Sequence, residues 1–526
     1  MNTSRRAPLA RRALAVFVGA VAAVSLLTGC LYSVIPSDAT SSPAPSRQPD
    51  LDGVPAGFEE FYAQTLDWTS CEGVDAGRYD CTTVTAPLDW SDPEAGTIDL
   101  AVIRRAATHG DAIGSLLTNP GGPGASGYDL IPQSASYAVG EAVLDAYDVI
   151  GFDPRGVGRS TAVKCLDAKA MDSMLYDIPA DPRGSQGWTD ELTQRNRDFV
   201  NACEAHSEGI LPYITTDNAA RDMDLLRGVF GDSKLNYLGY SYGTFLGATY
   251  AKLFPERVGR LVLDGAIDPS VSGTDVGTTQ AIGFESALRA YMADCLDGGD
   301  CPFSGTVDQA MADLGTLLAS VDAKPLRNSD GRMLGADTLM TGIIAALYSE
   351  DSWSYLTTAL AQTLEGDPST AFSLADFYNN RDRNGNYSDN STEAFRAYNC
   401  MDYPVDTSQA DKDAAQALVE QKAPTIAPYW QGVDVCEVWP YPPTGVREKI
   451  TADGAAPIVV VGTTNDPATP YAWSESLAAQ LSSGVLVTRE GEGHTGYNKG
   501  NTCVDSAVEG YLIDGTVPQD GLRCSR

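Results

Sequence analysis

The sequence predicts an α/β fold in which a mostly parallel sheet is flanked by helices and interrupted by a large helical insertion. Short apolar segments alternate with helical patterns from about residue 98 onward, which is typical of a parallel sheet covered on both faces. This alternation stops after residue 266 and resumes near residue 457. The segment between these points is therefore expected to form a helical cap.

Six apolar segments are expected as buried strands, and several are flanked by glycine. Their ranges are 115–119, 146–152, 234–240, 259–264, 457–462 and 484–488. Between them, helices are expected over 218–230, after candidate capping residues, and over 244–254, which Pro255 ends. Within the insertion, helices are expected over 281–296, 307–321, 336–348, 353–364 and 408–421.

Length and charge exclude several classes of protein. A chain of 526 residues with 43% hydrophobic content can bury a large core. Lys and Arg number 36 against 70 Asp and Glu, so the formal net charge is −34. Nucleic acid is not an expected partner, because binding its phosphates relies on basic side chains. The oligomeric state is left open.

The N-terminus has the form of an export signal. Four arginines precede an apolar run from Ala13 to Leu27, which is shorter than the roughly 20 residues that span a bilayer. The run ends in Leu-Thr-Gly-Cys, which resembles the bacterial lipobox, so Cys30 is expected to become the lipid-modified first residue. An ordinary cleavage site near a cysteine is the alternative. Residues 30–56 are then a flexible tether at the outer face of the cell membrane.

The other ten cysteines favour disulfides, because export places them in an oxidising compartment. The chain has no Cys-x-x-Cys pair and only three histidines, so no metal site is expected, and no cofactor. Connectivity cannot be proved from sequence. Pairing in sequence order gives Cys71–Cys81, Cys165–Cys203, Cys295–Cys301, Cys400–Cys436 and Cys503–Cys524.

The candidate nucleophile is Ser241, in Gly-Tyr-Ser-Tyr-Gly at residues 239–243. A serine in so tight a strand-to-helix turn needs glycine on both sides, because a Cβ there would clash with the neighbouring strand or helix. The pattern alone is weak in a chain with 51 glycines. The expected strand before it and helix after it provide the context that the motif requires.

A serine nucleophile needs a base, and only His494 follows Ser241 in the chain. In folds with this turn the order is Ser, acid, His, so His494 is the expected base. His109 and His206 are expected at the surface. The orienting acid is expected to be Asp466, which follows the penultimate strand, and Asp264 is its rival.

Acyl transfer also needs backbone donors for an oxyanion. One donor is expected from Tyr242, which follows the serine. The other is expected from Gly122 or Gly121 in the segment Asn-Pro-Gly-Gly-Pro-Gly, where glycine lets an amide approach the substrate. A plain turn is the alternative interpretation of this segment.

These motifs together resemble the actinobacterial secreted tripeptidyl aminopeptidases, α/β-hydrolases related to proline iminopeptidase. The resemblance covers most of residues 60–526 and rests on residues 119–124, 148–160, 219–224, 239–243 and 464–470. It implies a serine exopeptidase that releases short peptides, often tripeptides, from free N-termini. It also implies that Asp153, Arg155 and Ser160 brace the active-site loop. Proline iminopeptidases typically have histidine where this chain has Pro120.

An aminopeptidase must bind a protonated α-amine, and a buried ammonium needs a carboxylate partner. In the cap, Asp402 and Glu437 lie close to Cys400 and Cys436, whose disulfide would hold both acids on one frame. They are the expected amine ligands. A solvated acidic face is the alternative for each of them.

The expected function is an exported serine peptidase of the α/β-hydrolase fold whose substrates are peptide or protein N-termini. An exported esterase or lipase would use the same triad. A non-catalytic lipoprotein of the cell envelope is the third interpretation. The expected division is signal peptide 1–29, tether 30–56, first part of the core 57–266, cap 267–450 and second part of the core 451–526.

Overall fold

The structure, a computed structural model, describes residues 47–525 except 75–76, 109–110, 406–407 and 431. The expected signal peptide, Cys30 and most of the tether lie outside the described residues, as does His109. Within the described ranges, no helix is both long and apolar enough to cross a membrane.

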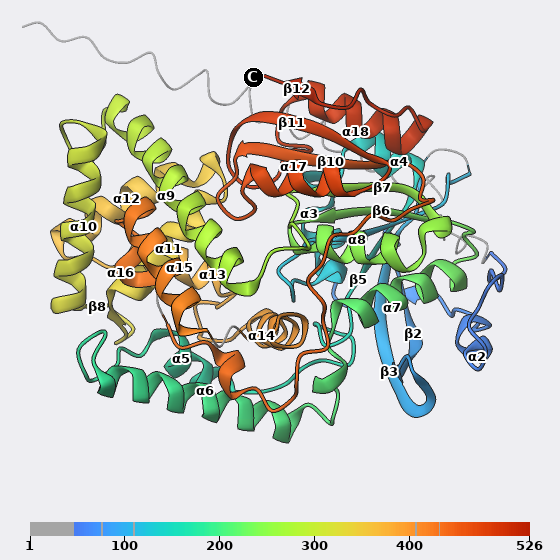
Figure 1. The fold of residues 1–526 in the computed structure, drawn as a ribbon, viewed down its shortest axis with the longest axis horizontal. Helices are drawn as coiled ribbons and strands as arrows, with labels where there is room; N and C mark the ends of the chain where they lie inside the picture. Colours follow the sequence, from blue (N-terminus) through green and yellow to red (C-terminus); the bar gives the residue numbers. More distant parts are fainter. Residues whose placement is uncertain (1–46, 75–76, 109–110, 406–407, 431, 526) are drawn as a thin grey trace, which may run out of the picture. The chain divides into compact units, whose positions relative to one another are not determined.

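A ten-stranded sheet in the order β1-β2-β3-β5-β4-β6-β7-β10-β11-β12 forms the centre of the fold (Figure 1). Strands β5 to β12 of this order pair in parallel, whereas β1, β2 and β3 add an antiparallel edge. The bounds are β1 Thr69–Ser70, β2 Asp80–Asp89, β3 Asp92–Arg105, β4 Ser115–Asn119, β5 Asp148–Phe152, β6 Leu235–Tyr240, β7 Val258–Asp264, β10 Ile458–Asn465, β11 Gly484–Glu492 and β12 Leu522–Cys524. The expected fold class is confirmed.

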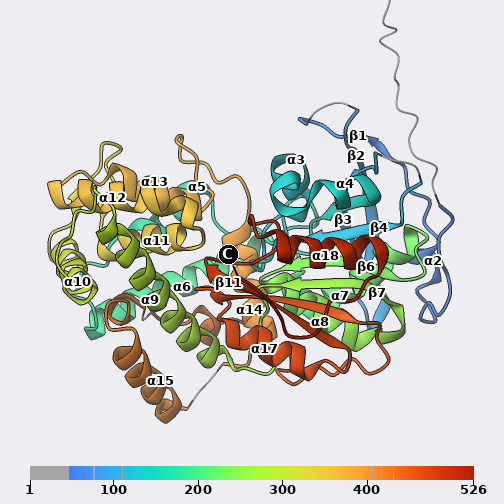
Figure 2. The ribbon, with the colours of Figure 1, turned by 90° about the horizontal axis from the view of Figure 1, so that it is seen from above.

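Helices cover both faces of the sheet, because successive strand residues point to opposite sides. Leu117 and Val460 belong to the core under one layer, and their neighbours Leu116 and Val459 belong to the core under the other. The first layer contains α2 Glu59–Tyr62, α7 Thr216–Val229, α8 Tyr242–Leu253 and α17 Tyr471–Gln480. The second contains α3 Gly127–Ala138, α4 Glu141–Ala146 and α18 Thr502–Asp514 (Figure 2). Burial on both faces explains why the central strands are continuous apolar runs.

Between β7 and β10 the chain forms a helical cap with a hydrophobic core of its own, which includes Phe284, Leu314, Ile343 and Leu360. Its helices are α9 Gly273–Asp297, α10 Val307–Ala323, α11 Ala336–Leu347, α12 Trp353–Glu365, α13 Ser369–Tyr378, α14 Ser391–Asp402, α15 Gln409–Lys422 and α16 Ala427–Trp430, with a hairpin of β8 Leu326–Arg327 and β9 Met333–Leu334. The sequence patterns did not indicate α13, α14 and α16.

Two further helices, α5 Ala168–Tyr176 and α6 Gln186–His206, leave the sheet after β5 and pack on the cap (Figure 1). Tyr176 belongs to the hydrophobic core of the cap, and Asn196 donates to the carbonyl of Val433 at 2.9 Å. The disulfide Cys165–Cys203 joins the two ends of this segment, residues 168–206, which we call the excursion. Packing therefore places the end of α5 in the core of the cap, whereas Phe199, Val200 and Cys203 of α6 belong to the core under the first helix layer.

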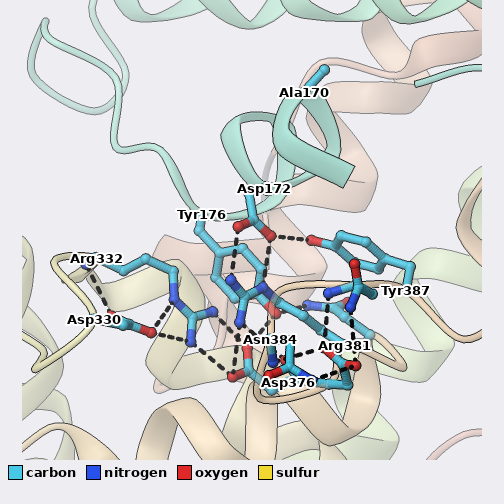
Figure 3. A network of polar contacts seen from close by, with 12 residues as sticks. Ala170, Asp172, Tyr176, Asp330, Arg332, Asp376, Arg381, Asn384 and Tyr387 are labelled. Atoms are coloured by element: carbon cyan, nitrogen blue, oxygen red, sulfur yellow. Dashed lines mark hydrogen bonds and ion pairs between the residues drawn. The ribbon is translucent and has the colours of Figure 1, made fainter. Parts of the chain in front are cut away.

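A polar network joins α5 to α13 and to the loop that follows α13 (Figure 3). Arg381 binds both carboxylate oxygens of Asp172 at 2.7 and 2.8 Å, and the Tyr387 hydroxyl donates to the same carboxylate. The Tyr176 hydroxyl donates to Asp376 at 2.8 Å. These contacts hold the excursion against the cap.

The structure contains five disulfides, and their pairing is the one expected from sequence order. Each closes a loop of 6 to 38 residues. Short cross-links of this kind stabilise a fold mainly by restricting its unfolded chain. Five disulfides indicate a protein that folds in an oxidising compartment.

Candidate active site

Ser241 lies in the turn between β6 and α8 with a φ of 54° and a ψ of −122°. This conformation is costly for a residue with a Cβ, and such residues cluster at functional sites. The glycines of the motif allow the turn to form. A Cβ on Gly243 would lie 2.9 Å from the carbonyl oxygen of Asn119, and one on Gly239 would collide with the carbonyl of Gly243.

The glycine loop after β4 runs directly against this turn. Gly121 has a φ of 99°, and a Cβ there would lie 2.6 Å from the carbonyl oxygen of Tyr240 and 3.2 Å from the amide nitrogen of Tyr242. The amide of Gly121 donates to the Asn119 side chain at 2.9 Å. Because that amide is engaged within the loop, Gly122 is the better candidate for the second oxyanion donor.

Four successive backbone amides hold the loop that carries the candidate base. The amide of residue 494 donates to the carbonyl of Tyr348 at 2.8 Å, and that of residue 495 donates to Asp466 at 3.1 Å. The amides of residues 496 and 497 both donate to Asp264 at 2.8 Å. Burial raises the pKa of Asp264 to about 6. The rival acid therefore binds the backbone of the loop through its carboxylate.

Asp466 is the carboxylate that contacts the imidazole. Both of its oxygens lie 2.9 Å from Nδ1 of His494. This residue is 2% exposed, and its carboxylate also accepts hydrogen bonds from the amides of Ala468 and Thr469 and from the Thr469 hydroxyl. These donors fix the carboxylate in place, so that it can hold the proton of the histidine on Nδ1.

The corner after β7 brings the nucleophile turn and the histidine together. The amide of Ser241 donates to the carbonyl of Asp264 at 2.9 Å. A Cβ on the next residue, Gly265, would lie 3.2 Å from Cε1 of His494. The three candidate catalytic residues thus follow the carboxyl ends of β6, β10 and β11, at the same edge of the parallel sheet. This arrangement is suited to nucleophilic acyl transfer.

Helix α14 of the cap covers the same region. In both views it lies between the other cap helices and the sheet (Figures 1 and 2). A Cβ on Gly124 of the glycine loop would lie 2.8 Å from the carbonyl oxygen of Ser391. The ring of Tyr398 lies 5.7 Å from that of Tyr242, and its hydroxyl donates to the carbonyl of Arg155. Sequence analysis missed this helix. The spacing of Ala394, Ala397, Tyr398 and Met401, all buried, is the signal that indicates it.

Comparison with known proteins identifies the family. Residues 423–524 match a family profile described as TAP-like protein. Over its whole length the chain is 35% identical to the serine protease Hip1 of Mycobacterium tuberculosis, and the alignment covers all of both chains. The chain belongs to the TAP-like α/β-hydrolases. It is also 38% identical to a carboxylesterase B of Mycobacterium tuberculosis over 96% of this chain and 98% of the relative. A tripeptidyl aminopeptidase of Streptomyces lividans is 30% identical over 88% of this chain and 86% of the relative.

In this TAP-like hydrolase, the two acids expected to bind a substrate amine lie in different surroundings. Asp402 is buried at the end of α14, where it accepts the amide of Thr216 at 2.9 Å and its hydroxyl at 2.6 Å. Burial raises the pKa of Asp402 to about 7. Glu437 is 42% exposed in its side chain and forms an ion pair with Lys412 at 2.6 Å. The disulfide joins their neighbours, but the two carboxylates bind different partners.

Asp153, Arg155 and Ser160 form internal contacts of the kind expected. Arg155 forms two hydrogen bonds of 2.7 Å with the carboxylate of Asp222, and both side chains are fully buried. Asp153 accepts the hydroxyl of Ser126 and two backbone amides, and Ser160 donates to its carbonyl. Burial raises the pKa of Asp153. The segment 153–160 also contacts α14, because the Tyr398 hydroxyl donates to the carbonyl of Arg155.

The exposed His206 interacts with the carbonyl of Cys165 at 2.7 Å, in the excursion that packs on the cap. Among the described residues, no group of three or more His, Cys, Asp or Glu side chains has an arrangement that could hold a metal ion.

Proposed function

We propose that this TAP-like hydrolase is an exported serine exopeptidase that cleaves peptides near a free N-terminus and releases tripeptides. The observation that carries the proposal is the contact of His494 with both oxygens of Asp466, beside a serine held at a φ of 54°. The relatives named serine protease Hip1 and tripeptidyl aminopeptidase support a peptidase activity.

In the proposed mechanism, Nε2 of His494 accepts the hydroxyl proton of Ser241 while Oγ attacks the scissile carbonyl. The amides of Tyr242 and Gly122 donate to the resulting oxyanion. The imidazolium then donates its Nε2 proton to the leaving amine, the C–N bond breaks, and an acyl-enzyme remains. A water molecule, deprotonated by His494, attacks this ester. The bond between the acyl carbon and Oγ breaks, His494 returns its proton to Oγ of Ser241, and the peptide is released as a carboxylic acid. Throughout these steps the carboxylate of Asp466 accepts a hydrogen bond from Nδ1–H of His494, and the proton stays on the histidine.

A substrate panel tests the peptidase proposal. We expect a tripeptidyl amide with a free N-terminus to be cleaved at least about 100-fold faster than its N-acetylated form. Acetylation removes the charge of the α-amine, so the groups of the enzyme that would bind this amine are left without a partner. The measurement is kcat/KM for di-, tri- and tetrapeptidyl aminocoumarin amides, free and acetylated. Equal rates for the free and acetylated forms would rule out an N-terminal exopeptidase.

A second candidate function is ester hydrolysis, because a 38% identical relative is named carboxylesterase B. The same triad serves either reaction, and fold does not decide between them. Matched p-nitrophenyl esters in the panel distinguish the two. Rapid ester turnover without cleavage of any peptide amide favours the esterase. Failure of a fluorophosphonate to label Ser241 favours a non-catalytic role.

We also propose that the mature chain is held at the outer face of the cell membrane through a lipid on Cys30. This rests on the lipobox-like segment and on the disulfides, which indicate export. Two or more acyl chains give stable anchoring, whereas one gives only marginal binding. The Cys30→Ala variant is expected in the soluble fraction after cell fractionation. Membrane retention equal to that of the wild type would contradict the anchor.

A further inference from the structure

Tyr348, a residue of the cap, contacts the candidate base through both its backbone and its ring. We propose that Tyr348 is a positioning residue for His494, so that the cap is a working part of the catalytic apparatus and not only a cover over it. The inference rests on the proposed triad. It concerns how the base is held and does not depend on which substrate is cleaved.

The backbone contact is a hydrogen bond in which the amide of His494 donates to the carbonyl of Tyr348 at 2.8 Å. On either side of His494, Gly493 has a φ of 89° and Thr495 a φ of 70°. Left-handed conformations persist only where the surroundings hold them, above all for a β-branched residue. A Cβ on Gly493 would lie 3.1 Å from the same carbonyl oxygen. The carbonyl therefore both binds the loop and limits how closely it approaches the cap.

The ring contact acts on the imidazole itself. The two ring centroids lie 5.3 Å apart with an interplanar angle of 89°, an edge-to-face arrangement. Asp466 fixes Nδ1 of His494 from one side, and the ring of Tyr348 limits how far the imidazole can tilt. His494 must transfer a proton first to the leaving amine nitrogen and later to Oγ of Ser241. Both transfers become slower when the orientation of the imidazole is loose.

Tyr348 is itself held by several parts of the cap. It follows the last residue of α11 directly. Its ring lies 5.9 Å from that of Phe284 in α9 and 6.1 Å from that of Tyr378 in α13. Burial raises the pKa of Tyr348 well above its ordinary value, so the phenol stays neutral near Asp466. Three cap helices thus meet at the residue that touches the base.

Two variants separate the ring from the hydroxyl. Tyr348→Phe keeps the ring and the carbonyl, and its kcat is expected within about twofold of the wild type. Tyr348→Leu keeps the carbonyl and removes the aromatic ring, and its kcat is expected to fall at least about tenfold while KM changes less than about threefold. The second-order rate constant for labelling of Ser241 by a fluorophosphonate is expected to fall by a similar factor, because labelling uses the same base.

Tyr291→Leu is the matched control. Tyr291 is a fully buried tyrosine of α9 that contacts Trp353 edge-to-face at 5.9 Å and hydrogen-bonds to Thr357, both within the cap. The control is expected to lower Tm, as Tyr348→Leu does, but to leave the labelling rate near that of the wild type. This comparison separates a loss of cap packing from a loss of base positioning.

The inference would be overturned if the folded Tyr348→Leu variant were labelled at the same rate as the wild type. Equal slowing in the Tyr348 and Tyr291 variants would also overturn it, because the effect would then be a loss of cap stability. The labelling assay contains no peptide, so it is independent of the proposed function. If the wild type labels but cleaves no peptide of the panel, the peptidase proposal fails and the positioning role stands. If the wild type does not label at all, both fail.

Discussion

Replacement of Ser241 by alanine is expected to lower kcat by about 10⁴-fold or more, the largest effect of any single change in this chain. Without the hydroxyl no acyl-enzyme forms, and only the oxyanion donors and substrate binding remain to accelerate direct attack by water. Alanine and serine both carry a Cβ, so the strained φ of 54° costs the variant no more than the wild type. The measurement is turnover of the best panel substrate, with Tm as the check on folding.

Ser373→Ala is a suitable control for this experiment. Ser373 is an exposed residue of α13 whose hydroxyl bonds only to the helix backbone, at the carbonyl of Ser369. Its loss is expected to leave kcat unchanged. Turnover in Ser241→Ala comparable to that of the wild type would refute the nucleophile, and with it the proposed mechanism.

Replacement of Asp466 by asparagine is expected to lower kcat by about 10³- to 10⁴-fold with little change in KM. Asparagine fills the same volume but can offer an amide N–H to Nδ1 of His494, which favours the tautomer with its proton on Nε2. That tautomer cannot accept the serine proton. The measurement is kcat and KM across pH, together with the rate of fluorophosphonate labelling.

Asp264→Asn provides the contrast, since this residue was the rival acid. Its carboxylate accepts the backbone amides of residues 496 and 497. An asparagine oxygen can still accept at least one of them, so kcat is expected to fall by about tenfold or less, with a lower Tm. A larger loss of kcat in Asp264→Asn than in Asp466→Asn would exchange the roles that we assign to the two acids.

Local patterns were sufficient to predict the central sheet and the order of the candidate catalytic residues. The six expected strands correspond to β4, β5, β6, β7, β10 and β11, because strands buried on both faces are uninterrupted apolar runs. The edge strands β2 and β3 were not expected. β2 contains Thr82, Thr83 and Pro87, and only three of its ten residues are buried, so it lacks that continuous signal.

The residues that connect the cap to the site could not be predicted in the same way. Tyr348 lies 146 residues from His494 in the chain, and its role depends on a backbone carbonyl, which every residue type has. The carboxylates of Asp402 and Glu437 were expected to share one frame. The disulfide does join their neighbours, but side-chain direction takes Asp402 to Thr216 and Glu437 to Lys412.

The sequence by itself determined the fold class, the strand-to-helix turn at Ser241 and the single histidine that follows it. Each of these depends on residues close together in the chain, where glycine, an apolar run or the order of a few residue types limits what the backbone can do. Tertiary structure alone decided that α5 packs on the cap, that Asp466 binds the imidazole while Asp264 binds the backbone, and that Tyr348 touches the base. These outcomes depend on where distant segments meet and which way each side chain points, and local patterns carry no information about either.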